Sequence, residues 1–278
     1  MAYGRVSRAV CGVLAGGLLL IGCSGSKADD PPGRPGPAGT GSAPPGVGSP
    51  GAGPAALSES PPRLDFDPDP ARAPKDPAAA RELAEAVVAG PDLWGPGFVR
   101  RTPFLSPPGY WPVLDETCAW QGGTPPSDVL YSLTAHSELP AAGGKGPLRV
   151  AATVTVHREV ADAEWEMADT LEEALRCPGQ KLRDGERIRG LMSIGYGFGT
   201  GGNLVAEDAI GEVGEFVSDA FGGKPYEYGW FQSRLGQVTV AAVTKGAEGH
   251  AAKEIHTARV EAMTRMMNRL EKRLEGAE

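Results

Sequence analysis

The alternation of apolar and polar positions between residues 129 and 157 predicts two β-strands. In residues 148–157, Leu, Val and Ala alternate with Arg, Ala, Thr and His, and residues 129–136 alternate in a similar way. Such alternation is typical of a strand whose two faces meet different surroundings. Gly143 and Gly144 lie between the two segments and favour a hairpin. Similar patterns predict further strands at 186–194, 212–219, 226–235 and 237–244.

Apolar side chains recur at helical spacing in two segments, 160–176 and 248–275, and each is expected to form a helix with one buried face. A shorter helix is predicted to begin at Asp76-Pro77, because an aspartate N-cap followed by proline is a common helix start. Residues 93–109 are rich in proline and aromatic side chains and are predicted to form an irregular loop. Together the patterns predict an α+β fold, in which helices 160–176 and 248–275 pack on one face of a mainly antiparallel sheet.

The N-terminal 75 residues show none of these periodicities. Arg5 and Arg8 precede an apolar run from Ala9 to Ile21, which is typical of a secretory signal peptide and too short to span a bilayer. Between residues 31 and 62, 18 of 32 residues are proline or glycine, so this stretch lacks the apolar side chains that a core requires. We expect a signal peptide at 1–22, a disordered tether at 23–75 and one extracytoplasmic domain at 76–278.

The residues Leu20-Ile21-Gly22-Cys23 end the apolar run and resemble the lipobox of bacterial lipoproteins. This resemblance implies that the signal peptide is removed after Gly22 and that a diacylglycerol is attached to the sulfur of Cys23. Two acyl chains give a stable membrane anchor, whereas one chain alone is marginal. The expected location is therefore the extracytoplasmic face of the cell membrane, with Cys23 as the lipidation site and the membrane as a partner.

Three of the four cysteines follow the predicted signal peptide. If Cys23 carries lipid, Cys118 and Cys177 remain. Because exported proteins fold in an oxidising compartment, we predict a disulfide between these two residues. The alternatives are two free thiols or a metal-binding pair, although two cysteines without nearby histidines make a poor zinc site.

Charge and motifs argue against several classes of function. The net charge of −8 disfavours a nucleic-acid partner, since phosphate contacts require clustered Lys and Arg. The GxGxxG pattern at 197–202 follows a predicted strand without clearly opening a helix, and Ser193 has one residue too many before it for the GxSxG motif. Of the four histidines, only His136 and His157 lie in neighbouring predicted strands. We therefore expect no catalytic residue, no metal and no cofactor.

The acidic residues of helix 160–176 are expected to form a solvated face. Aromatic residues supply the candidate ligand cleft instead: Tyr226, Tyr228 and Trp230 alternate along one predicted strand, while Tyr196 and Phe198 flank a glycine-rich loop. Packing in the core is the alternative role for these side chains.

Two further resemblances concern the whole layout. A lipobox, a Gly/Pro-rich tether and a two-cysteine domain are similar to the small exported lipoproteins of actinobacteria. The segment from Trp111 to Trp120 around Cys118, the helix ending at Cys177 and the final hairpin and helix resemble the extracytoplasmic sensor domain of PknH-type receptor kinases, over about residues 110–275. That resemblance implies helices on an antiparallel sheet, a cleft and an unknown ligand. This chain departs from it with one expected disulfide instead of two, and with no kinase.

These patterns lead to one main hypothesis and two alternatives. The main hypothesis is a ligand-binding or sensor-like lipoprotein of the cell envelope, with an unidentified envelope ligand or protein as its partner. The first alternative is a scaffold that acts through protein–protein contacts, and the second is an envelope hydrolase.

Overall fold

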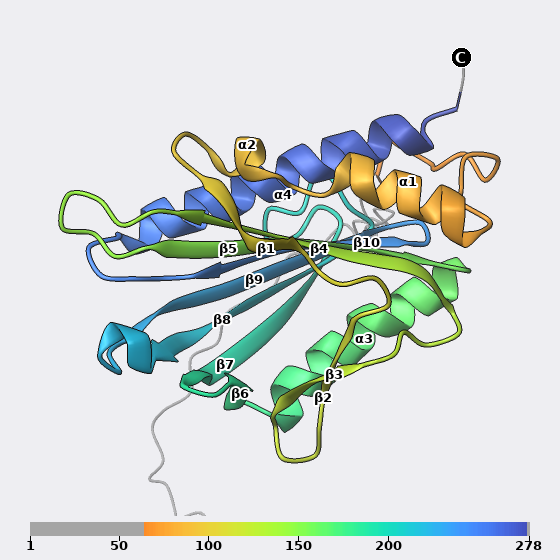
Figure 1. Cartoon of the computed structure of the whole chain (residues 1–278). Coiled ribbons are helices and arrows are strands. Elements are labelled where there is room, and N and C mark those ends of the chain that lie inside the picture. The colour runs from red at the N-terminus through yellow and green to blue at the C-terminus, as the bar shows by residue number, and fades with distance from the viewer. Residues whose placement is uncertain (1–63, 277–278) are drawn as a thin grey trace, which may run out of the picture. The chain divides into compact units, whose positions relative to one another are not determined.

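A computed structural model describes residues 64–276. The strands are β1 (Val99–Leu105), β2 (Trp111–Leu114), β3 (Trp120–Gly123), β4 (Val129–Leu139), β5 (Leu148–His157), β6 (Gln180–Arg183), β7 (Glu186–Gly197), β8 (Asp208–Ser218), β9 (Pro225–Leu235) and β10 (Val238–Lys245). The α-helices are α1 (Pro77–Val87), α2 (Pro91–Trp94), α3 (Val160–Arg176) and α4 (Ala252–Leu274). Eight strands form one antiparallel sheet in the order β1-β4-β5-β10-β9-β8-β7-β6, and β2 pairs with β3 in a separate ribbon (Figure 1).

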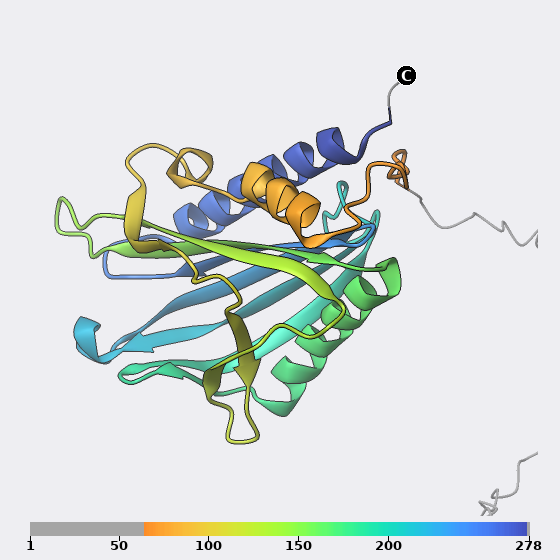
Figure 2. The ribbon, with the colours of Figure 1, turned by 45° about the vertical axis from the view of Figure 1, so that its right-hand side comes forward.

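The sheet carries helices on both faces. Figures 1 and 2 show α1, α2 and α4 on one side, and α3 with the β2–β3 ribbon on the other. The predicted α+β class with a mainly antiparallel sheet is confirmed, and α1 and α4 are the helices that pack together on one face. The placement of helices 160–176 and 248–275 on the same face is wrong. Helix α3 packs on the face of the sheet opposite to α4, so both faces are covered by helices.

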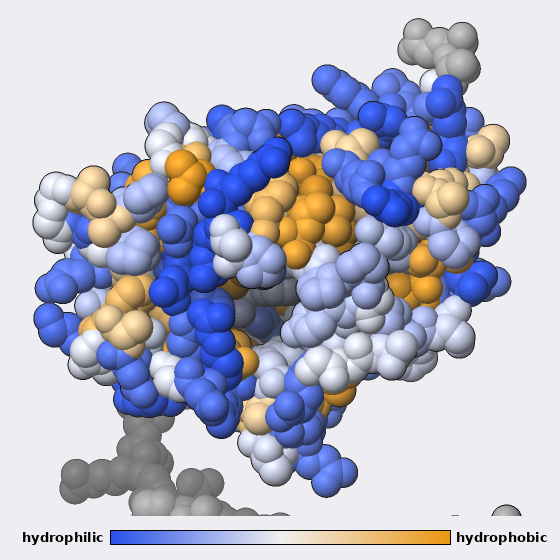
Figure 3. Space-filling model, viewed as in Figure 1, coloured by the Kyte–Doolittle hydropathy of each residue, from blue (hydrophilic) through white to orange (hydrophobic). Residues whose placement is uncertain are grey.

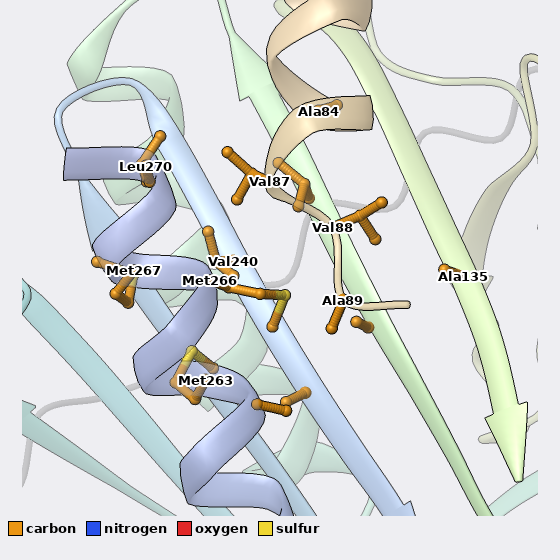
Figure 4. Close-up of a cluster of buried hydrophobic side chains, with 14 of the residues drawn as sticks. Ala84, Val87, Val88, Ala89, Ala135, Val240, Met263, Met266, Met267 and Leu270 are labelled. Carbon is orange, nitrogen blue, oxygen red and sulfur yellow. The ribbon is translucent and has the colours of Figure 1, made fainter. Parts of the chain in front are cut away.

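The main hydrophobic core lies between the sheet and the pair α1 and α4. Figure 4 shows side chains of α4 packed against the end of α1 and against β10; its labelled residues include Val87, Val88, Val240, Met263, Met266 and Leu270. The facing positions of β5 are the alternate residues from Leu148 to Val156, all of which are apolar and buried. Burial of this surface from water is the main stabilising contribution to the fold.

Helix α1 begins where the sequence predicts. The Asp76 side chain accepts hydrogen bonds from the backbone N–H groups of Ala78 and Ala79, at 2.9 and 3.0 Å. These bonds satisfy two of the donors that a helix start leaves unpaired, and Pro77 stands at the position where no donor is required.

The predicted loop at 93–109 is wrong in part, because it contains β1 and the end of α2. Pro103 lies within β1, and a proline in a sequence argues against a strand. Since β1 is the edge strand beside β4, it can contain a proline, whose missing N–H interrupts no hydrogen bonds between central strands. The short strands β2, β3 and β6 were also not expected, because four residues show too little alternation.

The folded part begins before Asp76. Leu64 and Phe66 pack against the main core, and the Asp69 backbone N–H donates to the Leu274 carbonyl at 2.9 Å. Residues 64–75 therefore belong to the domain, whereas the tether was expected to end at 75. The predicted signal peptide, Cys23 and the remainder of the tether lie outside the described residues. Within 64–276, no helix combines the length and the apolar character needed to cross a membrane.

Candidate functional site

A cavity of about 630 Å³ lies between the sheet, α3 and the β2–β3 ribbon. Strands β4, β5, β8, β9 and β10 line it on the sheet side, and Tyr110, Trp111 and Trp120 contribute aromatic rings from the ribbon and the loop before it. The space-filling view shows the surface hollowed near its centre on this side of the molecule (Figure 3). The volume is in the range of small-molecule sites.

The sheet presents polar side chains to this cavity. On β5, Thr153 and Thr155 face it, and each pairs with a hydroxyl of β4: Ser132 with Thr155 at 3.1 Å, and Thr134 with Thr153 at 2.9 Å. The opposite face of the same strand is entirely apolar from Leu148 to Val156. A face that served packing alone would also be apolar, so this polar wall is suited to contact with water or with a polar molecule.

One carboxylate of α3 organises the α3 side of the cavity. Glu166 Oε2 accepts from His157 Nε2 at 2.6 Å and from Thr239 Oγ1 at 2.8 Å, and its Oε1 accepts from Gln232 Nε2 at 3.0 Å. Gln232 in turn accepts from Thr170 Oγ1 at 2.8 Å. This network connects α3 with three strands and holds the cavity wall in one conformation.

Two further carboxyl groups have strongly shifted pKa values. Glu212 on β8 is only 6% exposed, and burial raises its pKa to about 7. Burial also raises the pKa of Glu173 on α3 to about 7. Both groups line the cavity, and each is partly protonated near neutral pH. They can therefore donate as well as accept hydrogen bonds from a ligand.

The other end of the cavity is basic. Arg101, Arg149, Arg183 and Lys245 line it together with Glu186, a carboxylate that is almost fully buried. Burial lowers the pKa of Lys245 to about 8, with further lowering by the neighbouring arginines. The cavity is thus acidic toward α3 and basic at the end formed by β5, β6 and β10.

The structure places the five residues of the predicted aromatic cleft in different surroundings. Tyr228 and Trp230 line the cavity, whereas Tyr226, Tyr196 and Phe198 are not part of its lining. Tyr226 packs edge-on against the Phe221 ring, with the ring centroids 6.2 Å apart. Near the end of β7, the Tyr196 ring lies over Gly201 of the following loop, where a larger side chain would collide with it.

The glycine-rich motif and the histidines do not form the sites of known enzyme families. Residues 197–202 connect the antiparallel strands β7 and β8 without a helix, so this GxGxxG pattern lacks the context of a dinucleotide site. His136 and His157 both face the cavity, but they pair with Ala151 and Val129, at well-separated points of β4 and β5. Within 64–276, no group of His, Cys, Asp and Glu has the arrangement of a metal site.

Most of the polar cavity residues were missed by sequence reasoning. The acidic residues of α3 were expected to form a solvated face, yet Glu166, Asp169 and Glu173 line the cavity, although Asp169 is also exposed to solvent, as are Glu164 and Glu172. The three inward residues are spaced at three and four positions, which is the spacing of one helix face. This polar stripe on the helix could have indicated from the sequence that α3 lines a polar cavity.

The predicted disulfide joins two walls of the cavity. Cys118 lies in the turn between β2 and β3, and Cys177 caps the C-terminus of α3; their sulfurs are 2.06 Å apart. Asp115 holds the turn by accepting from the backbone N–H of Ala119 and from the hydroxyl and backbone N–H of Thr117, and these hydrogen bonds lower the pKa of Asp115 to about 2. The pairing of Cys118 with Cys177 is confirmed, and it attaches the aromatic ribbon to α3.

Comparison with protein-family models and with curated proteins finds no match to this chain. The resemblances to bacterial lipoproteins and to a kinase sensor domain therefore remain predictions. The chemistry of the cavity is the main guide to what the protein does.

Proposed function

We propose that the protein is a lipid-anchored binding protein of the cell envelope, and that its cavity takes a small polar ligand. The observation that carries this proposal is the difference between the two faces of the sheet. One face is apolar and buried against α1 and α4, while the other presents hydroxyl, amide and charged groups to a cavity of about 630 Å³.

Three residues of the cavity lining carry buried polar atoms that have no partner in the part of the chain that the structure describes. Trp230 Nε1, Glu186 Oε2 and His157 Nδ1 are buried, and none has a hydrogen-bond partner among residues 64–276. A buried polar atom without a partner costs about 1–3 kcal/mol, so such atoms are uncommon unless they serve a role.

Thermal unfolding of the full chain, purified in a polyoxyethylene detergent, tests ligand binding. Polar envelope compounds (sugars, amino acids, short peptides and phosphorylated sugars) are added one class at a time. Thr153→Trp fills the middle of the cavity, and Val213→Trp places the same ring at an exposed position of β8. A ligand is expected to raise Tm in the wild type and in Val213→Trp but not in Thr153→Trp. Equal shifts in all three, or no shift with any class, would contradict the proposal.

Lipid attachment at Cys23 is tested separately. Cys23→Ala is expected to abolish incorporation of a labelled fatty acid, because the thiol that accepts the diacylglycerol is gone. Replacement of Cys118 or Cys177 is the matched control, and it should leave lipid labelling intact. Continued labelling of the Cys23→Ala protein would refute the anchor.

One observation supports hydrolysis as a second function. Glu173 and Glu212 face the same cavity with pKa values of about 7, and a carboxyl group titrating near neutral pH can act as a general acid or base. If the protein is a hydrolase, Glu212→Gln will keep ligand binding and lose turnover. Recovery of a bound ligand unchanged after long incubation with the wild type would eliminate this function.

A further inference from the structure

Two cations stand side by side at the basic end of the cavity. Lys245 of β10 pairs directly with Arg149 of β5 in the sheet register, and both side chains line the cavity. They are only 25% and 19% exposed. Like charges directly opposite on neighbouring strands are destabilising, so this pair requires a compensating interaction.

The carboxylates nearby compensate only half of the positive charge. Glu186 Oε1 accepts from Arg149 Nη1 at 2.6 Å and from Arg183 Nη2 at 2.7 Å, while Lys245 Nζ lies 3.8 Å from Oε2, beyond hydrogen-bond distance. Arg101 pairs with Glu138, with Nε and Oε2 3.4 Å apart. Four cations therefore face two carboxylates, which leaves an excess of two positive charges.

The cations also repel one another. Burial lowers the pKa of Arg101, and the neighbouring Arg149 lowers it further. Burial likewise lowers the pKa of His136, with an added contribution from Arg101. Arg183 is 56% exposed, but Arg101, Arg149 and Lys245 are largely shielded from water. Holding the charge of these three away from water is costly, and the cost is relieved when an anion binds.

Aromatic rings hold the two central cations in place. The Arg149 guanidinium lies over the Phe221 ring at 5.0 Å from its centroid, and Lys245 Nζ lies 5.5 Å from the centroid of Phe216. Cation–π contacts of this kind fix a cation without neutralising it. The basic end is therefore ordered before any anion arrives, which reduces the entropy lost on binding.

We propose that Arg101, Arg149, Arg183 and Lys245 bind the carboxylate or phosphate group of the ligand. This inference rests on the proposed binding function and adds the charge of the ligand and its orientation. Guanidinium groups suit the two oxygens of such an anion, and Lys245 supplies a further donor. Because Glu166 and Glu173 stand on the α3 side, the anionic group lies at the opposite end, against β5, β6 and β10.

Calorimetric titration of the full chain in polyoxyethylene detergent, at low ionic strength, tests the inference. The probes are inorganic phosphate, acetate, glucose 6-phosphate and glucose. Phosphate or acetate is expected to bind, and glucose 6-phosphate to bind at least about tenfold more tightly than glucose, as charge-assisted hydrogen bonds predict. Comparison of phosphate with acetate separates a phosphate ligand from a carboxylate ligand.

Variants assign the binding to this end of the cavity. Arg149→Gln and Lys245→Gln should each weaken the bound anion by roughly tenfold or more, while Lys245→Arg should keep it. Arg81→Gln makes the same charge change on the exposed surface of α1 and should have no effect. Near-UV circular dichroism identifies any variant that fails to fold, and the charge-conserving Lys245→Arg then decides the result.

Three outcomes would overturn the inference. These are the absence of anion binding in the wild type, equal binding in the glutamine variants, and equal affinity for glucose and glucose 6-phosphate. If the ligand screen on the same chain finds a neutral ligand that Thr153→Trp excludes, the binding function stands and only the anion site fails. If the screen also finds none, both fail.

Discussion

Replacing Glu212 by glutamine removes a deeply buried carboxyl group from the cavity wall while keeping its size and shape. In the folded protein, burial raises the pKa of Glu212 to about 7, whereas the ordinary value is 4.5. Above pH 4.5 the unfolded chain releases this proton first, so the unfolded state gains stability relative to the folded state as the pH rises. The free energy of unfolding stops falling once the pH passes the pKa that Glu212 has in the folded protein.

The size of the effect follows from the shift. One pKa unit corresponds to 1.36 kcal/mol, so the raised pKa lowers the free energy of unfolding by about 3 kcal/mol at high pH. Glutamine does not titrate, and Glu212→Gln therefore lacks this loss. At about pH 5 the variant and the wild type should have similar stability, and at about pH 8 the variant should be more stable by about 3 kcal/mol.

Urea denaturation with the disulfide intact measures this difference at each pH. Glu215→Gln is the matched control, because Glu215 is on the same strand but is 54% exposed and pairs with Arg189 at 3.0 Å. The control should follow the wild-type pH profile. Parallel profiles for wild type and Glu212→Gln, or a difference that grows toward low pH, would refute the reasoning.

Three further variants test the fold. Replacing Cys118 and Cys177 by serine opens a loop with a sequence separation of 59 residues. The free energy of unfolding, measured by urea denaturation, should fall by about 4 kcal/mol. A change below about 1 kcal/mol would contradict the disulfide. Gly229→Ala should destabilise by about 3 kcal/mol, because its new methyl group meets the buried Arg259 guanidinium, and an unchanged Tm would show that Arg259 moves aside easily. Asp76→Ala should cost about 1 kcal/mol through loss of the N-cap of α1, with Tm as the readout and an unaltered Tm as the contrary result.

The sequence predicts the elements of this fold well wherever one face is apolar. The clear alternation of β5 and the Asp76-Pro77 helix start are local signals, and the structure confirms both. The disulfide was predictable on the expectation that Cys23 carries lipid, which leaves Cys118 and Cys177 to pair. Strand β1 was not, since Pro103 interrupts a pattern that only its edge position allows.

The cavity could not be predicted in the same way. Alternation shows that Thr153 and Thr155 share a polar face, but it does not show whether that face meets water or a second layer. The answer depends on α3, which packs there through contacts that are distant in sequence, such as the bond between Glu166 and Thr239. Likewise, Lys245 approaches the other cations only because β10 inserts between β5 and β9.

In β5 and β10, odd-numbered residues face the cavity and even-numbered residues face the core beneath α4. If the cavity binds a ligand as proposed, neighbouring codons of one strand are subject to different selective pressures. Descendants of this sequence could then acquire a new ligand by exchanging odd-numbered residues while the even-numbered residues preserve folding. Among related chains, we expect positions 149, 153, 155, 239 and 245 to diverge together with the ligand, and positions 150, 152, 154 and 240 to stay small and apolar.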